Sequence, residues 1–220
     1  MPAAFLQIGA RIRAERVRRG ISLRGLARGV GLSPSLISQI ETGKCQPSVS
    51  TLYAITTVLG VSVQDVFGDG ADAAARAQTA GGGPVALAAD GAGVPVVSPG
   101  VSVGEVAGPV VCPGQREILE LDSGVTWQRL GHVPGSNVDF LMVTYAPGGC
   151  SSEEGRLMDH PGTEYGYLVQ GELVVTLGFR SHRLTPGDAV SFASATPHSY
   201  RNEGTVPAVG IWFVAGPGGA

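Results

Sequence analysis

The chain has 220 residues, a length that suits two domains better than one small module. A hydrophobic fraction of 43% with only 15% charged residues allows a sizeable core and excludes wholesale disorder. No apolar run approaches the roughly 18 residues of a membrane helix, the start of the chain lacks the apolar region of a signal peptide, and the cysteines form no CxxC pair. We therefore expect a soluble, cytoplasmic protein without a membrane partner or a disulfide framework.

The net charge of −3 is distributed unevenly along the chain. Residues 1–67 carry eight arginines and lysines against three acidic residues, a net charge of +5, whereas residues 68–220 have a net charge of −8. This contrast predicts that a polyanion binds to the first part of the chain only.

Residues 1–67 are predicted to form five short helices, because apolar residues recur there at helical spacing. The apolar groups are Ile8/Ile12, Leu23/Leu26/Ala27/Val30, Leu36/Ile37/Ile40, Leu52/Ile55/Leu59 and Val63/Val66/Phe67. Residues that suit helix caps separate these groups. They are Ser22, Ser33 and Ser48 or Ser50 at helix starts, and Gly31 and Gly60 at helix ends.

The composition changes abruptly after residue 67. Residues 68–104 are mostly Gly, Ala and small polar residues with little to bury, which is typical of a flexible linker. From residue 105 to 220 short apolar segments alternate with a period of two and are bounded by Gly, Pro, Asn and Asp. Regularly spaced strands without helical interludes predict an all-β sandwich or barrel.

The second and third predicted helices are joined by a tight turn at residues 31–33, with the small residue Ala27 where the helices would touch. Two helices that cross steeply need these features, as in a helix-turn-helix. The stretch GISLRGLARGVGLSPSLISQIETGKCQPSVSTLYAITTVLGVSVQDVF resembles the XRE (lambda-repressor-like) helix-turn-helix family over the whole of residues 1–67. Leu23 departs from the family, which often has a polar, DNA-facing residue there.

The resemblance implies that the third helix, residues 33–42, lies in the major groove of double-stranded DNA. Short or amide-bearing side chains occupy its outer side. These are Ser33, Ser35, Ser38 and Gln39. We expect Gln39 to read a base, since an amide can pair bidentately with adenine. Arg24, Lys44 and the N–H groups at the starts of the second and fourth helices are expected to hold phosphates. The resemblance also implies that Arg16 pairs with Glu41 inside the domain.

Two segments of the β region carry a second resemblance. HPGTEYGYLVQGELVVTLG and LTPGDAVSFASATPHSYRN resemble the two signature motifs of the cupin barrel, over roughly residues 110–215. The first motif runs from His160 through Glu164 to Gly171, and the second from Gly187 through His198 to Asn202. We therefore predict a two-domain α + β chain: a five-helix lambda-repressor-like bundle at 1–67, and an all-β cupin (double-stranded β-helix) barrel at 105–220.

Metal-binding cupins typically present three histidines and one glutamate, but Met158 stands at the position of the first histidine. His160, Glu164 and His198 remain, and two histidines with one carboxylate suit Fe, Zn or Ni. The same cluster could instead hydrogen-bond internally or contact a ligand without metal. Strand alternation predicts that Gly166, Leu168 and Gln170 point inward with Glu164, so Leu168 is a further candidate ligand contact. His132 and His182 fall in turn-like segments and are expected at the surface.

The joined architecture resembles the XRE–cupin transcriptional regulators. This resemblance implies a homodimer that binds an operator and whose barrel senses a small-molecule effector or a metal. The rival hypothesis is a mononuclear iron enzyme, since epoxidases of the hydroxypropylphosphonate type have this domain order and a comparable set of two histidines and one glutamate. A scaffold protein with vestigial sites is a third possibility.

Overall fold

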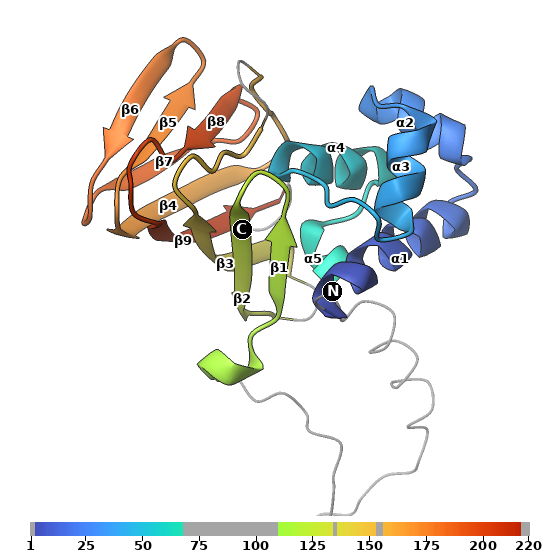
Figure 1. Cartoon of the computed structure of the whole chain (residues 1–220), viewed down its shortest axis with the longest axis horizontal. Helices are drawn as coiled ribbons and strands as arrows, with labels where there is room; N and C mark the ends of the chain where they lie inside the picture. The colour runs from blue at the N-terminus through green and yellow to red at the C-terminus, as the bar shows by residue number, and fades with distance from the viewer. Residues whose placement is uncertain (1–2, 68–109, 134–135, 153–155, 217–220) are drawn as a thin grey trace, which may run out of the picture.

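The computed structural model describes residues 3–67, 110–133, 136–152 and 156–216. A helical domain, which we call the head, lies beside a β barrel (Figure 1). The predicted linker at 68–104 lies outside the described residues. No helix in the described part of the chain is long and apolar enough to cross a membrane.

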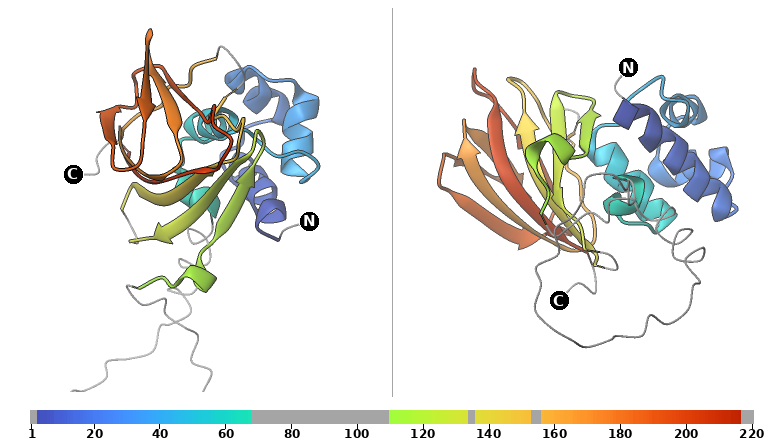
Figure 2. Two further views of the ribbon diagram at one scale, coloured as in Figure 1. Left: turned by 60° about the vertical axis from the view of Figure 1, so that its left-hand side comes forward. Right: turned by 90° about the horizontal axis from the view of Figure 1, so that it is seen from below.

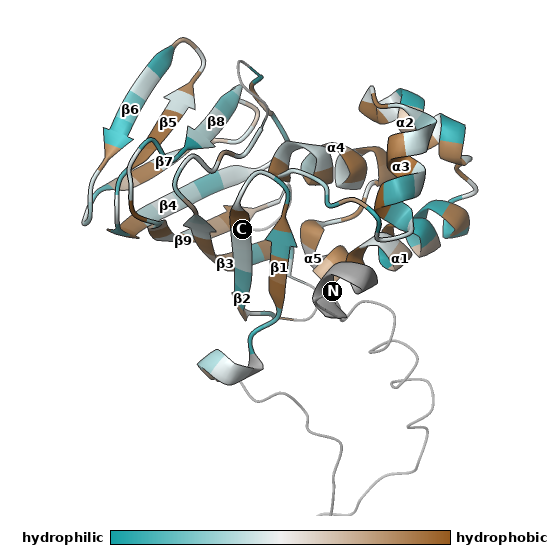
Figure 3. Cartoon of the chain, in the orientation of Figure 1, coloured by the Kyte–Doolittle hydropathy of each residue, from teal (hydrophilic) through white to brown (hydrophobic). Residues whose placement is uncertain are grey.

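The head contains the five predicted helices. They are α1 (Ala3–Arg18), α2 (Leu23–Val30), α3 (Pro34–Glu41), α4 (Val49–Leu59) and α5 (Val63–Phe67). Three serine hydroxyls accept a hydrogen bond from a first-turn N–H group: Ser22 at α2, Ser33 at α3 and Ser48 at α4. Gly31 and Gly60 end α2 and α4 in the left-handed conformation that glycine adopts at little cost. Helix α3 carries both hydrophilic and hydrophobic residues (Figure 3).

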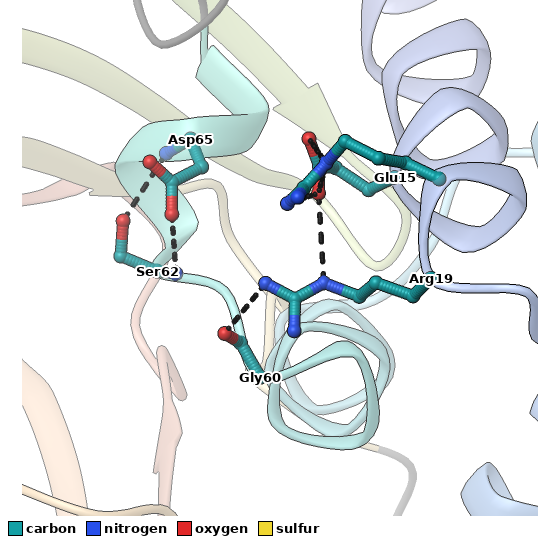
Figure 4. Close-up of polar contacts among 6 residues, drawn as sticks. Glu15, Arg19, Gly60, Ser62 and Asp65 are labelled. Atoms are coloured by element: carbon teal, nitrogen blue, oxygen red, sulfur yellow. Dashed lines mark hydrogen bonds and ion pairs between the residues drawn. The ribbon is translucent and has the colours of Figure 1, made fainter.

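Two polar links hold the head together. The guanidinium of Arg16 donates two hydrogen bonds to the Glu41 carboxylate, at 2.5 and 2.8 Å, which confirms the predicted pair. Both side chains are buried, so removal of one partner would strand a charge in the core. Arg19 reaches from the end of α1 to the carbonyl of Gly60, 3.1 Å away, and also pairs with Glu15 (Figure 4). The ends of α1 and α4 are thereby joined.

The described residues of the barrel form nine strands in two sheets. The strands are β1 (Ile118–Leu121), β2 (Val125–Gly131), β3 (Val138–Tyr145), β4 (Thr163–Gln170), β5 (Leu173–Leu177), β6 (Arg180–Leu184), β7 (Ala189–Ala193), β8 (His198–Arg201) and β9 (Ala208–Ala215). One sheet has the order β1-β2-β3-β9-β4-β7 and the other β6-β5-β8, and every named pair is antiparallel. A short 3₁₀ helix at Pro113–Gln115 precedes β1.

Strand β4 follows the predicted alternation over most of its length. Glu164, Gly166 and Leu168 are buried and point inward, but Gln170 is exposed, so its predicted inward position was wrong. The pairing of β4 with β9 shifts register between Leu168 and Gln170, and such a bulge reverses the side on which the next side chain lies. Gly166 is required by close packing, because a Cβ there would lie 2.8 Å from the ring of Trp212.

Helix α4 lies between the barrel and helices α2 and α3, while α1 and α5 contact the barrel at β1 and β3 (Figures 1 and 2). Two backbone hydrogen bonds join the start of α4 to barrel loops. The Ser50 N–H donates to the Ser151 carbonyl at 3.0 Å, and the Asp122 N–H donates to the Pro47 carbonyl at 3.1 Å. Helices α2 and α3 are on the far side of α4 from the barrel, so the predicted DNA-reading surface is not covered by it.

Candidate nucleic-acid interface and metal cluster

The outer face of α3 is polar and accessible. Ser35 and Gln39 are exposed one turn apart, and Ile37 and Ile40 are buried on the opposite side, as predicted. Ser38 is half-buried. Ser33 is exposed, and its hydroxyl accepts the Leu36 N–H at 3.2 Å, which leaves its proton and one lone pair for a contact with DNA.

Arg24 on α2 and Lys44 after α3 are exposed. Leu23, the departure from the family pattern, is half-buried against the core instead of facing solvent. The start of α4 differs from the prediction. Its Ser50 N–H, expected to hold a phosphate, is bonded to the barrel, and its Thr51 N–H is bonded to the Ser48 hydroxyl.

His160, Glu164 and His198 come together inside the barrel, as the motif spacing predicted. One potential ligand atom from each lies within 4.8 Å of the others, and all three side chains are buried. The Glu164 Oε1 atom is 2.9 Å from the His160 Nε2 atom and 3.0 Å from the His198 Nε2 atom. None of these three atoms has a hydrogen-bond partner among the described residues.

The tautomer of His198 explains why its Nε2 atom and the Glu164 Oε1 atom can be so close without a hydrogen bond. Its Nδ1 atom lies 2.8 Å from the Thr196 carbonyl, and because a carbonyl only accepts, Nδ1 carries the proton. The Nε2 atom of a neutral His198 then presents a lone pair toward Glu164. A shared cation or an added proton is needed between them, which is the arrangement that fits a divalent metal.

Glu164 is held as an anion at this point. Burial works to raise its pKa, but the adjacent His160 and His198 side chains outweigh burial and lower the pKa to about 2. The other carboxylate oxygen accepts the Tyr200 hydroxyl proton at 2.7 Å, and the Tyr200 oxygen accepts the Trp212 indole N–H at 3.2 Å. This chain of hydrogen bonds fixes the orientation of the carboxylate.

Sequence reasoning did not assign Tyr200 to the site, although a signal was present. Tyr200 is two residues after His198 on β8, and residues two apart on a strand point to the same side. Tyr53 was also missed. Its ring, which belongs to α4 of the head, is stacked on the His160 imidazole with centroids 3.9 Å apart and planes 4° from parallel.

The cavity that Glu164 lines is small. The cavity beside Glu164 has a volume of about 20 Å³, enough for one water molecule or one ion. Val49 and Tyr53 of α4 line it together with barrel residues that include Met158. Leu168, expected to contact a ligand, is fully buried but does not line this cavity; it packs in the core. This cavity is too small for an organic ligand, and the expectation that one binds inside the barrel stays a prediction.

A larger cleft of about 300 Å³ lies between the head and the barrel rim. The turn from α4 to α5 forms one wall, and Asn137, Asp139, His160 and Pro161 belong to the other. Asp139 is buried, and its Oδ1 atom has no hydrogen-bond partner among the described residues. A molecule in this cleft would touch both domains and could supply the missing hydrogen bond.

The two remaining histidines lie apart from the cluster. His132 follows β2 in a loop, as expected, and is half-buried. His182 lies in strand β6 and not in a turn, so that part of the prediction was wrong, but it is exposed as expected. Arg180, Ser181 and Arg183 on the same strand are also exposed, and this lack of apolar alternation explains why the strand was not recognised.

Comparisons with known proteins agree with the two folds. Residues 7–66 match the family model described as "Helix-turn-helix domain", and residues 141–214 match the model described as "Cupin domain". The HTH-type transcriptional regulator PuuR of Escherichia coli is 26% identical over 196 residues, which cover 88% of this chain and 86% of that protein. The immunity repressor protein of Bacillus phage phi105 is 36% identical over 64 residues, 29% of this chain and 44% of the repressor.

Among solved structures, an HTH_3 family transcriptional regulator from Vibrio cholerae has the same overall fold, with a TM-score of 0.61 and 20% identity over 97% of each chain. Hydroxypropylphosphonic acid epoxidase from S. wedmorenis aligns over 97% of this chain and 100% of the enzyme, with a TM-score of 0.42 and 17% identity. The similarity to the epoxidase is too low to support a conclusion about enzymatic activity.

Proposed function

Because the chain belongs to the XRE-like helix-turn-helix proteins that carry a C-terminal cupin domain, we propose that it is a sequence-specific DNA-binding transcriptional regulator. The accessible polar face of α3, on a head with a net charge of +5, carries this proposal. Helix α3 enters the major groove, where Gln39 reads a base. Arg24 and Lys44 hold phosphates beside it, and Ser33, Ser35 and Ser38 contribute hydroxyl groups.

Selection of fragments from genomic DNA by the purified full-length protein tests this function. A shared sequence should emerge that is bound at least 10³ times more tightly than random DNA at physiological salt, the lower end of the usual specificity range. Uniform, weak binding to all fragments would contradict a role as a sequence-specific regulator.

The regulator works as a homodimer whose two heads bind half-sites about 34 Å apart. The second copy packs on the outer face of the larger sheet. Three half-exposed aromatic side chains form a row there across neighbouring strands: Phe140 on β3, Phe213 on β9 and Tyr165 on β4. Their rings touch edge to face, with centroids 6.3 and 6.4 Å apart. An apolar row of this kind is unusual on a free surface and suits self-association.

The barrel holds one divalent metal ion, Fe, Zn or Ni, through His160, Glu164 and His198. Support comes from the three potential ligand atoms, which lie within 4.8 Å of one another, with the Thr196 carbonyl setting the tautomer of His198. When bound, such an ion supplies the positive charge that the buried Glu164 carboxylate lacks. Metal content measured on the purified protein and on His198→Ala should differ by one equivalent.

The organic effector binds in the cleft between the head and the barrel. Its volume of about 300 Å³ is at the lower limit of typical ligand sites, and the buried Asp139 carboxyl calls for a ligand with a hydrogen-bond donor. A compound that raises the unfolding temperature of the parent protein but not of Asp139→Asn would belong to this class of ligands with a hydrogen-bond donor.

An iron-dependent enzyme is the second candidate, favoured by the set of two histidines and one carboxylate alone. Two observations oppose it. The cavity at the cluster has room for an ion but not for an organic substrate, and no arginine or lysine is among the described residues that line it. The exposed Arg183 side chain pairs with Glu172 and Glu203 and does not line this cavity. Stoichiometric iron in the purified protein, together with oxygen consumption, would favour the enzyme.

A further inference from the structure

Helix α4 of the head forms part of the wall of the metal cluster. Val49 and Tyr53, which are four residues apart and therefore on one face of the helix, line the same small cavity as Glu164. The Tyr53 ring covers one face of the His160 imidazole at 3.9 Å. The Tyr53 and His160 side chains are both buried, so water does not separate the head from this ligand residue.

The other contacts of His160 come from the barrel. Its Nε2 atom lies 2.9 Å from Glu164, and its ring meets the His198 ring edge to face at 5.3 Å. The Nδ1 contact to the Pro161 carbonyl is long, at 3.4 Å, compared with 2.8 Å for the equivalent contact of His198. His160 is therefore less firmly held by the barrel backbone than His198, and its plane depends more on Tyr53.

The opposite side of α4 belongs to the DNA-reading head. Leu52, Ile55 and Leu59 are fully buried in the core that α4 shares with the other helices. The Ser50 N–H of α4 also donates a hydrogen bond to the barrel, so α4 is anchored both to the head and to the barrel. A change in the contact between α4 and the cluster is therefore transmitted to the support of α2 and α3.

We propose that Tyr53 is a positioning residue for the metal ligands, so that metal binding and docking of the head strengthen each other. This inference rests on the metal site proposed above. A cation at Nε2 withdraws electron density from the imidazole, and an electron-poor ring stacks more favourably on a phenol. Thermodynamic linkage then requires that a docked head raises metal affinity by the same factor as metal raises docking.

Zinc affinity, measured for the full-length protein by competition with a chromophoric chelator, tests this linkage. Replacement Tyr53→Leu keeps bulk but removes the stack, and should weaken zinc binding between about threefold and tenfold, which corresponds to the usual range for aromatic pairs. Tyr53→Phe keeps the ring and should bind zinc within about twofold of the parent. Thr57→Ala, an exposed position on the same helix, is the matched control and should behave like the parent.

Hydrogen exchange supplies a second readout that needs no variant. Zinc should slow exchange of the α4 amides more than exchange of the α1 amides, because only α4 contacts the cluster. Equal slowing in both helices, or none in α4, would overturn the linkage. Equal zinc affinity in the parent and a folded Tyr53→Leu variant would overturn it as well while leaving the metal site standing. A parent protein that binds no zinc at all would refute the proposed metal site itself, and the linkage with it.

Discussion

At the scale of single residues, Gln39 and Arg24 illustrate two different contributions to DNA binding. Gln39→Ala should lower discrimination at one base position by ~1–3 kcal/mol, because only a base contact carries sequence information. Arg24→Ala should weaken binding to all sequences alike and reduce the slope of log affinity against log salt by about 1. Binding titrations over a salt series, with the selected operator and its single-base variants, distinguish the two. Full selectivity in Gln39→Ala would contradict the assignment of the base-reading residue.

The buried Asp139 carboxyl makes stability depend on pH. Burial and the neighbouring Asp65 raise its pKa, Arg129 lowers it, Glu164 raises it further, and the result is a pKa of about 7 compared with an ordinary value of 3.8. The folded protein therefore holds this proton more tightly than the unfolded chain, and the free energy of unfolding should fall as pH rises from about 4 to about 7. A difference of about 3 in pKa corresponds to ~4 kcal/mol.

Chemical denaturation of the parent and of Asp139→Asn over this pH range measures that contribution. The asparagine variant cannot titrate, so its free energy of unfolding should lack this fall while other groups contribute equally to both proteins. Parallel pH profiles would show that the carboxyl does not change its charge on folding.

At the scale of secondary-structure elements, the serine cap of α3 contributes to the stability of the reading helix. Ser33→Ala removes the acceptor for the Leu36 N–H and should lower the free energy of unfolding of the head by ~1 kcal/mol. Denaturation followed by far-ultraviolet circular dichroism measures this, since the α-helices of the described residues all lie in the head. Ser35→Ala, on the same helix but with no capping role, should change stability far less; equal losses in the two variants would contradict the capping role.

Elements of the head could be predicted from the sequence because their signals are local. Helical spacing, serine caps and glycine ends lie within a few residues of one another and do not depend on the rest of the fold. Two features of the barrel could not be predicted in this way. Gln170 faces outward because a bulge forms only in the pairing with β9, and β6 has no apolar alternation because it is an edge strand of a small sheet.

At the scale of the whole molecule, the proposed dimer depends on the aromatic row Phe140–Phe213–Tyr165. Phe213→Glu places a charge at the centre of this row and should shift the protein from dimer to monomer, with at least a tenfold loss of operator affinity because the two heads no longer act together. Sedimentation velocity measures the first effect and DNA titration the second.

Phe179→Glu is the matched control, because Phe179 is fully exposed at the tip between β5 and β6 and lies outside the row. It should leave the oligomeric state unchanged. A Phe213→Glu variant that stays dimeric would exclude this face as the interface.

The sequence alone determined the two folds, the exposed polar face of α3 and the cluster of His160, Glu164 and His198. The exposed face of α3 follows from helical periodicity, whereas the two folds and the cluster follow from the resemblance of the motifs to the lambda-repressor-like and cupin families. The tertiary structure alone decided that the cavity beside Glu164 has the volume of a single ion, that the Ser50 amide bonds to the barrel, and that Tyr53 lies on His160. These features arise where α4 packs against strands far away in the chain, and such contacts leave no periodic signal in either partner.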